Sequence, residues 1–187
     1  DIIAFLSFHY KKKGILKNNG VSVTKISNYG LFKFFKDNNI EYDIVDVGDR
    51  NVSYSMKKND FMIGGEPSGH IILKNYLPTG DGIITSLEFL KAVIENKMRV
   101  SDVKKIWKRF PSYLSSYKVN SKPEISKLSD FNKKIREIEK KIKGRIVVRY
   151  SGTEPVLRIL IEADKDKDHL KKLADDIYTY YQASIKV

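Results

Sequence analysis

Hydrophobic residues in the first hundred positions follow two spacings, one typical of helices and one typical of strands. Helices are predicted over residues 1–13, 28–39 and 83–96, and a shorter one ends at Lys58. Asn28 and Asp81 stand where helix-capping side chains are expected. Short extended segments lie between the helices, at 21–24, 41–47, 61–63 and 71–73. This alternation of helices and strands predicts an α/β layer.

The pattern changes after residue 100. A short helix is expected over 101–108, and Phe110–Ser116 is predicted to be a linker. Residues 129–142 give a strongly charged helical pattern, which Gly144 is expected to end. The remaining elements are extended segments at 117–119, 145–150 and 156–163, and a last helix at 166–183 with Leu170, Leu173, Ile177 and Tyr180 facing inward.

These patterns divide the chain into two domains. We expect an α/β domain over residues 1–108, a linker or hinge over 109–116, and a small α+β domain over 117–187. A chain of 187 residues with 41% hydrophobic content has enough apolar material for a packed core.

Composition excludes several classes of protein. The chain contains no cysteine, which excludes a disulfide scaffold, a cysteine zinc site and a thiol nucleophile, and fits a reducing compartment. No apolar run is long enough to cross a bilayer, and no signal-peptide pattern opens the sequence. We therefore expect a cytoplasmic protein with no membrane partner.

The net charge of +12 suggests an anionic partner. Only Lys11–Lys13 form a tight basic run, acidic residues lie near most other lysine pairs, and lysine far outnumbers arginine. No RNA-binding, zinc-finger or arginine-stripe motif is present. We favour a solvated basic surface suited to small anions and keep nucleic acid as the less favoured alternative.

The segment Gly64-Gly65-Glu66-Pro67-Ser68-Gly69-His70 is the first with distinctive chemistry. Its glycines allow sharp turning and close approach to a ligand. Glu66 can accept hydrogen bonds from neighbouring sugar hydroxyls, Ser68 can donate and accept, and His70 can titrate. A plain turn between two strands, with Glu66 solvated, remains the alternative.

The segment Arg149-Tyr150-Ser151-Gly152-Thr153-Glu154-Pro155 is the second. Arg149 ends a strand, Ser151 and Thr153 supply hydroxyls, and Gly152 can expose backbone amides in an anion nest. An arginine fork, hydroxyls and free amides are what a phosphate dianion requires. A hairpin turn with a solvent-facing Arg149 is the alternative.

Other candidates are weaker. Gly48-Asp49-Arg50 stands at the carboxyl end of a predicted strand, where open α/β sheets bind ligands, but could equally cap a helix. His9 and His169 are expected at the surface, and Trp107 in the core. The sequence shows no Ser-His-Asp arrangement, Walker loop or metal-ligand cluster.

The two loops resemble those of the α-D-phosphohexomutases. Residues 64–70 are similar to that family's sugar-binding loop, Gly-Glu-x-Ser-Gly-His, with Pro67 at a variable position. Residues 149–155 resemble its phosphate-binding loop, in the Ser-Gly-Thr-Glu-Pro form of the glucosamine branch. Four other segments, at 16–19, 27–30, 47–50 and 79–82, also resemble segments of the family and follow the same order along the chain.

The resemblance implies a chain similar to the third and fourth of four family domains. These are an α/β sugar-binding domain and a small α+β domain similar to TATA-binding protein. The family's phosphoserine loop and its Asp-Gly-Asp-x-Asp-Arg magnesium loop do not occur in this sequence. The resemblance therefore implies a C-terminal portion, inactive alone, that binds no Mg²⁺ itself and works with N-terminal domains in cis or in trans.

The implied activity is that of an isomerase. Such enzymes interconvert glucosamine 6-phosphate and glucosamine 1-phosphate through a phosphoserine and a 1,6-bisphosphate intermediate, on the route to UDP-N-acetylglucosamine. By resemblance, Glu66 and Ser68 would bind sugar hydroxyls and His70 would sit beside the reacting centre. The phosphate not being transferred would be held by Arg149, Ser151, Gly152 and Thr153, and the last domain would close by hinging near 110–116.

Two alternatives stay open. The chain could come from the phosphoglucomutase or phosphomannomutase branch, although the Ser-Gly-Thr-Glu-Pro loop argues against it. It could also be a non-catalytic module that binds phosphosugars or nucleic acid on the same fold.

Overall fold

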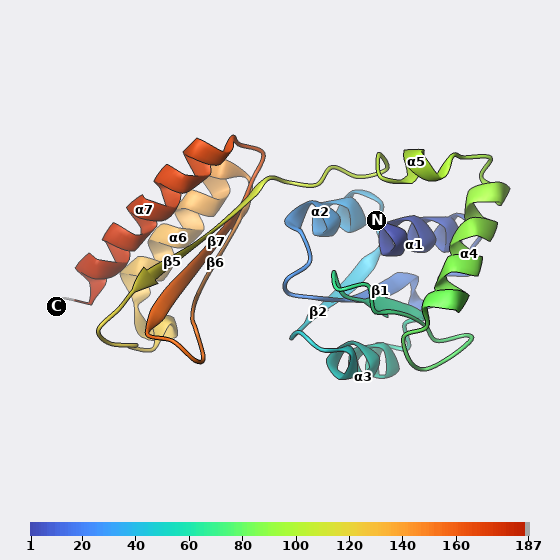
Figure 1. Ribbon diagram of the computed structural model, residues 1–187, viewed down its shortest axis with the longest axis horizontal. Coiled ribbons are helices and arrows are strands. Elements are labelled where there is room, and N and C mark those ends of the chain that lie inside the picture. Colours follow the sequence, from blue (N-terminus) through green and yellow to red (C-terminus); the bar gives the residue numbers. More distant parts are fainter. Residues whose placement is uncertain (186–187) are drawn as a thin grey trace. The chain divides into compact units, whose positions relative to one another are not determined.

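The computed structural model describes residues 1–185, and the chain divides into two compact units, Asp1–Arg109 and Phe110–Val187 (Figure 1). We describe each unit by itself. Among the described residues, no helix is both long and apolar enough to cross a membrane.

Unit 1 is built on a four-stranded mixed sheet of order β2-β1-β3-β4. Strand β1 pairs in parallel with both β2 and β3, and β4 pairs antiparallel with β3. The strands are β1 (Gly20–Thr24), β2 (Glu41–Val45), β3 (Ile63–Gly65) and β4 (Ile71–Leu73). The helices are α1 (Ile2–Lys12), η1 (Lys17–Asn19), α2 (Tyr29–Asp37), α3 (Asp49–Asn59), α4 (Gly82–Glu95) and α5 (Val100–Val103).

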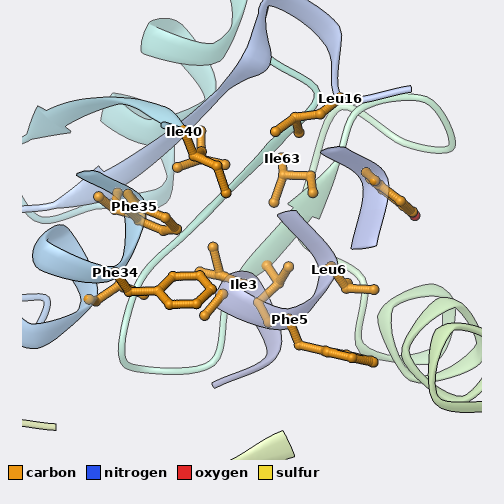
Figure 2. Packing of buried hydrophobic residues seen from close by; sticks show 14 of the residues in the cluster. Ile3, Phe5, Leu6, Leu16, Phe34, Phe35, Ile40 and Ile63 are labelled. Atoms are coloured by element: carbon orange, nitrogen blue, oxygen red, sulfur yellow. The ribbon is translucent and has the colours of Figure 1, made fainter. Parts of the chain in front are cut away.

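Helices cover both faces of this sheet. Helices α1, α2 and α4 share one cluster of buried apolar residues with the sheet (Figure 2), whose labelled members are Ile3, Phe5, Leu6, Leu16, Phe34, Phe35, Ile40 and Ile63. Helix α3 packs on the other face, where Val52 and Met56 meet Phe61 and Ile72. This two-sided arrangement is the expected α/β layer. The two predicted caps are confirmed: Asn28 accepts from the Gly30 amide (3.1 Å) at the start of α2, and Asp81 accepts from the Ile84 amide (2.7 Å) at the start of α4.

Unit 2 is a three-stranded antiparallel sheet of order β5-β7-β6 with helices packed on it. Its elements are β5 (Ser112–Lys118), η2 (Ile125–Lys127), α6 (Ser129–Ile142), β6 (Arg145–Tyr150), β7 (Val156–Glu162) and α7 (Lys167–Ser184). The inward rows of the sheet join α6 and α7 in a separate core that includes Phe131, Ile159, Leu170 and Tyr181. An α/β domain followed by a smaller domain with an antiparallel sheet and helices is the fold class expected from the sequence.

Several boundaries differ from the sequence predictions. Ser112–Lys118 form β5, so residues 112–116 of the predicted linker and hinge are hydrogen-bonded sheet. Strand β3 begins at Ile63, two residues later than the predicted start at Phe61, and α5 ends at Val103. In α7 the buried residues are Leu170, Ala174, Ile177 and Tyr181, and Leu173 is partly buried against the same core, whereas Tyr180 is exposed, contrary to the prediction.

The environments of three singled-out residues follow from this packing. Trp107 is buried, as predicted, and its Nε1 donates to Asp1 Oδ1 (2.9 Å). His9, expected at the surface, is buried beside Asn96 and Glu95, so that prediction was wrong. Burial lowers the pKa of His9 below its usual range, and the neighbouring Glu95 only partly offsets this. His169 is exposed, as expected.

Candidate functional site

The first candidate loop joins β3 to β4 and is held by its own backbone. The Glu66 amide donates to the His70 carbonyl (3.1 Å), and the Gly69 amide donates to the Glu66 carbonyl (3.1 Å). Gly69 has φ +99°, a conformation that a residue with a Cβ rarely adopts. The turn therefore fixes Glu66, Ser68 and His70 close together, as the sequence suggested.

Glu66 is the anchor of this loop. Its side chain is only 8% exposed, whereas that of His70 is 64% exposed. His70 Nδ1 lies 3.1 Å from Glu66 Oε1 and 3.2 Å from Ser68 Oγ. The carboxylate is thus buried and partnered rather than solvated, which contradicts the plain-turn alternative for this residue.

Electrostatics keep Glu66 ionised. Burial is the largest single influence and opposes the charge, but hydrogen bonds from Ser68, His70 and the Gly48 amide together outweigh it, so the pKa of Glu66 lies below its ordinary value. An ionised carboxylate can only accept hydrogen bonds, so it is suited to hydroxyl donors such as those of a sugar.

One residue of the weaker candidate segment, Gly48-Asp49-Arg50, forms a hydrogen bond with this loop. The Gly48 amide donates to Glu66 Oε2 (3.3 Å), which ties the start of α3 to the loop after β3. Both lie at the carboxyl ends of parallel strands, where ligands of open α/β sheets bind. Arg50 itself lines a separate hollow of about 370 Å³ with Ser53, Tyr54 and Thr79 among its other walls.

The second candidate loop, residues 151–155, joins β6 to β7. The Ser151 amide donates to the Val156 carbonyl (2.9 Å), and Lys122 Nζ donates to the Ser151 carbonyl (2.8 Å). The Val119 amide donates to the Pro155 carbonyl (2.9 Å). The ends of the loop are therefore fixed, and its middle, Gly152–Glu154, is exposed.

The middle of the loop offers unused donors. Within residues 1–185, the backbone amides of Gly152 and Thr153 have no hydrogen-bond partner. Gly152 does not have a positive φ, so the left-handed step of an anion nest is not formed there. A Cβ on Gly152 would meet nothing within 4 Å, so the fold alone does not require glycine at this position. The free amides and the Thr153 hydroxyl can serve an anion without the nest geometry.

Strand register adds an arginine that the sequence reasoning missed. Arg149 on β6 lies directly opposite Arg158 on β7, and Ser116 on β5 is the next member of the same row. Directly opposed like charges destabilise a sheet, so an anion between them would relieve the repulsion. The spacing of Arg149 and Arg158 around a five-residue turn was the signal that could have identified Arg158. Arg158 also bonds Glu154 of the loop (3.1 Å).

A metal has no ready place in the described residues. Among positions 1–185 no group of three or more His, Asp or Glu side chains is arranged to hold an ion. The described residues therefore do not fit the magnesium that the resemblance implies for the family.

Two family models match the chain. "Phosphoglucomutase/phosphomannomutase, alpha/beta/alpha domain III" covers residues 1–110, and "Phosphoglucomutase/phosphomannomutase, C-terminal domain" covers residues 91–179. The chain belongs to the phosphoglucomutase/phosphomannomutase family. This confirms the resemblance read from the two loops.

Several relatives of this family are similar over nearly the whole chain. Phosphoglucosamine mutase of Bdellovibrio bacteriovorus is 36% identical over 98% of this chain and 40% of its own length. That of Caldicellulosiruptor saccharolyticus is 39% identical over 98% of this chain and 42% of its own length. The chain thus spans about 40% of the length of these relatives.

Solved structures of the family show the same fold. A substrate complex of N-acetylglucosamine-phosphate mutase matches with a TM-score of 0.69 at 20% identity, covering 97% of this chain and 43% of that one. The Aspergillus fumigatus N-acetylphosphoglucosamine mutase, solved with GlcNAc-6P and magnesium, matches with a TM-score of 0.67 at 16% identity, over 98% of this chain and 43% of that one.

Proposed function

We propose that this chain is the sugar- and phosphate-binding portion of a phosphoglucosamine mutase. The observation that carries the proposal is the register of β6 and β7, which places Arg149 directly opposite Arg158 at the end of the hairpin whose loop, within residues 1–185, leaves the amides of Gly152 and Thr153 without a hydrogen-bond partner. Two guanidinium groups and two free N–H donors match the charge and the acceptor oxygens of a phosphate dianion.

Unit 1 supplies the sugar contacts in this proposal. Glu66 is ionised and accepts hydroxyl hydrogen bonds, Ser68 adds a donor, and the exposed His70 ring stands beside the reacting centre. These contacts position the substrate and stabilise its charge. In the proposal, the phosphoserine and the magnesium are supplied by a polypeptide equivalent to the N-terminal domains of the relatives.

Glucosamine phosphate is the proposed substrate because the relatives with the same coverage are named phosphoglucosamine mutases and because the loop reads Ser-Gly-Thr-Glu-Pro. The phosphoglucomutase or phosphomannomutase branch is the second candidate. Competition between glucosamine 6-phosphate, glucose 6-phosphate and mannose 6-phosphate for the chain distinguishes the branches.

The test is calorimetric titration of glucosamine 6-phosphate into the chain. We expect weak, saturable binding that falls by about 10- to 100-fold in Arg149→Ala, because a charge-assisted contact contributes about 1.5–3 kcal/mol. Arg136→Ala is the matched control, since Arg136 is an exposed arginine on α6 and should leave affinity unchanged. Equal affinity of Arg149→Ala and the unaltered chain would contradict the phosphate assignment.

A second variant separates sugar from phosphate recognition. Glu66→Ala should weaken glucosamine 6-phosphate binding more than binding of inorganic phosphate, because Glu66 is placed for hydroxyls. Equal losses for the two ligands would count against the sugar role of Glu66.

A further inference from the structure

Lys122 lies outside the second candidate loop but binds it directly. Its Nζ donates to the Ser151 carbonyl oxygen (2.8 Å). That carbonyl belongs to the same peptide group as the amide of Gly152, which has no hydrogen-bond partner within residues 1–185. The peptide is planar and trans, so its C=O and its N–H point in opposite directions. Lys122 therefore binds the carbonyl side of a peptide group whose N–H side is free for a ligand.

The Lys122 bond affects this free N–H in two ways. It fixes the plane of the peptide group, so the Gly152 N–H has a defined direction, away from the ammonium group. It also polarises the peptide, because a cation at the carbonyl oxygen draws electron density from the amide nitrogen and makes its N–H a stronger donor. A hydrogen bond from an ionised donor is roughly twice as strong as a neutral one, so this contact persists in competition with water.

The segment 119–123, in which the lysine lies, is itself bound to both ends of the loop. At one end, Tyr150 Oη donates to the Pro123 carbonyl (2.8 Å). At the other, the Val119 amide donates to the Pro155 carbonyl (2.9 Å). The backbone on either side of the lysine is therefore fixed to the hairpin, and its side chain needs to order only itself to make the bond.

The core of unit 2 fixes Tyr150 in turn. Its Oη lies 2.9 Å from Oη of Tyr181, which is fully buried and packs edge-on against Phe131. Burial raises the pKa of Tyr150, and so does the Tyr181 hydroxyl. The Tyr150 hydroxyl therefore stays protonated at neutral pH and keeps donating to Pro123.

We propose that Lys122 is a positioning residue of the phosphate site, which orients and polarises the Gly152 amide that donates to the phosphate. The inference rests on the proposed function, because it deepens the phosphate site assigned there. It extends that site to a segment outside β6, β7 and the loop between them. It also explains how Gly152 can present its amide without the positive φ of an anion nest, since a charged side chain does the orienting.

Two simpler accounts compete with this role. Lys122 is exposed, so its bond could be an incidental surface contact with no effect on the Gly152 amide. The chain also has a net charge of +12, so any lysine near the loop could aid an anion through its charge alone. The two accounts require a variant that removes the bond and a control that removes the same charge elsewhere.

Lys122→Met removes the ammonium group and keeps a long unbranched side chain. Lys127→Met is the matched control, because the Lys127 side chain is 79% exposed and pairs with Glu124 (2.9 Å). Among the described residues it has no bond to the loop. Both variants lose one positive charge from the same region of the chain. Lys122→Arg keeps the charge and a donor for the Ser151 carbonyl.

Calorimetry measures the effect on affinity. We expect Lys122→Met to bind inorganic phosphate and glucosamine 6-phosphate about three- to tenfold more weakly, because the donor that it no longer fixes is one contact of the phosphate. Lys122→Arg should bind within about twofold of the unaltered chain, and Lys127→Met should be unchanged. Urea unfolding should give the same stability for all of these variants, since both lysines are exposed.

Nuclear magnetic resonance measures the Gly152 amide itself, with and without ligand. In the ligand-free chain we expect Lys122→Met to lower the order parameter of the Gly152 N–H from about 0.85 to below about 0.6, because the bond that fixes the peptide is lost. Saturation with inorganic phosphate should move the Gly152 amide proton downfield by less in this variant. Lys127→Met should match the unaltered chain in both measurements.

An order parameter at Gly152 that is the same in Lys122→Met and the unaltered chain would overturn the proposal. So would phosphate affinity that falls equally in Lys122→Met and Lys127→Met. If Arg149→Ala weakened phosphate binding and Lys122→Met did not, this inference would fail and the proposed function would stand. If the chain bound neither phosphate compound, the proposed function would fail, and the ligand-free order parameter would still decide whether Lys122 orients the amide.

Discussion

At the scale of single residues, the pair Arg149 and Arg158 has the clearest consequence. Arg149 on β6 lies directly opposite Arg158 on β7, and Glu154 (3.1 Å from Arg158) is the one carboxylate that the structure gives beside this like-charged pair among the described residues, so an anion would stabilise it. We expect Arg158→Gln to reduce affinity for glucosamine 6-phosphate by about tenfold, through the loss of a charged hydrogen bond. The same variant should leave the ligand-free chain as stable as before or slightly more stable. Calorimetry and urea unfolding measure the two effects.

A purely structural Arg158 would behave differently. Its bond to Glu154 would then be its main contribution, and Arg158→Gln would lower stability while leaving phosphate affinity intact. The exposed arginine at 136 again serves as the control, because Arg136→Gln should change neither quantity.

Thr24 carries a buried hydroxyl group without a hydrogen-bond partner among the described residues. Its side chain is fully buried at the end of β1, and among the described residues its Oγ1 is the only buried side-chain oxygen or nitrogen without a hydrogen-bond partner. Thr24→Val removes the unpaired hydroxyl and keeps the branched shape. We expect the free energy of unfolding to rise by about 1 kcal/mol, measured by urea unfolding.

Thr85 is the matched control for this prediction. It is also buried, but its Oγ1 donates to the Asp81 carbonyl (2.6 Å). Thr85→Val should therefore lower the free energy of unfolding by about 1 kcal/mol. If both substitutions lowered it equally, the Thr24 hydroxyl would have a partner, such as an ordered water, in solution.

The residues of the candidate loops could be predicted from the sequence, but their burial and their hydrogen-bond partners could not. Glu66 and His70 were both visible in the pattern, yet nothing in it indicated that Glu66 is buried while His70 is exposed. Nor did the pattern indicate the Gly48 amide as a partner, because it donates to Glu66 from 18 positions away in sequence. His9 was misplaced for a similar reason, because its partners Glu95 and Asn96 lie at the end of α4, far along the chain.

At the scale of elements, capping and helical spacing predicted the helices well, and strands were the weaker part. Only the end of β5 was predicted, within the extended segment 117–119. Residues 112–116 were predicted to be linker because small polar residues there alternate irregularly with Tyr113 and Leu114. The strand character of β5 depends on pairing with β7, whose partner residues begin at Val156, far from Lys118 along the chain. Such long-range pairing is not contained in local propensity.

The end of α6 also differs in detail from the sequence expectation. Gly144 was expected to end the helix, but Lys143 adopts the left-handed conformation, with φ 51°. A residue with a Cβ is strained in that conformation by about 1 kcal/mol, so Lys143→Gly should raise the free energy of unfolding by about that amount. Urea unfolding followed by circular dichroism measures it, and Lys140→Gly, within the same helix, should lower stability instead.

Gly144 itself is needed for a different reason. A Cβ at this position would lie 2.3 Å from the Glu162 carbonyl oxygen of β7. Gly144→Ala should therefore destabilise unit 2 by about 1–3 kcal/mol, because backbone must shift to admit the methyl group. The two neighbouring substitutions thus act in opposite directions, and the same sign for both would contradict this account of how the helix ends.

At the scale of the whole molecule, each of the two units is stabilised by a hydrophobic core of its own. The clusters around the first sheet contain no residue beyond Trp107, and the cluster around the second begins at Phe131. The sequence anticipated this division through its change of pattern after residue 100. It did not show that β5 begins at Ser112, two residues after the unit boundary, because residues 112–116 were predicted to be linker.

Because the two units have separate hydrophobic cores, we expect them to unfold independently. The fluorescence of Trp107 reports on the unfolding of unit 1. Trp107 is the only tryptophan, and it is buried in the core of unit 1. Leu6 and Leu170 are fully buried leucines, one in each core, and truncation of either to alanine should cost about 2–5 kcal/mol locally. Leu6→Ala should lower the urea midpoint of Trp107 fluorescence, whereas Leu170→Ala should leave it in place and lower only the amide-exchange protection of β7. A Trp107 midpoint that moved equally in both variants would show that the two units unfold as one, because only a shared cooperative transition transmits a loss in one core to a reporter in the other.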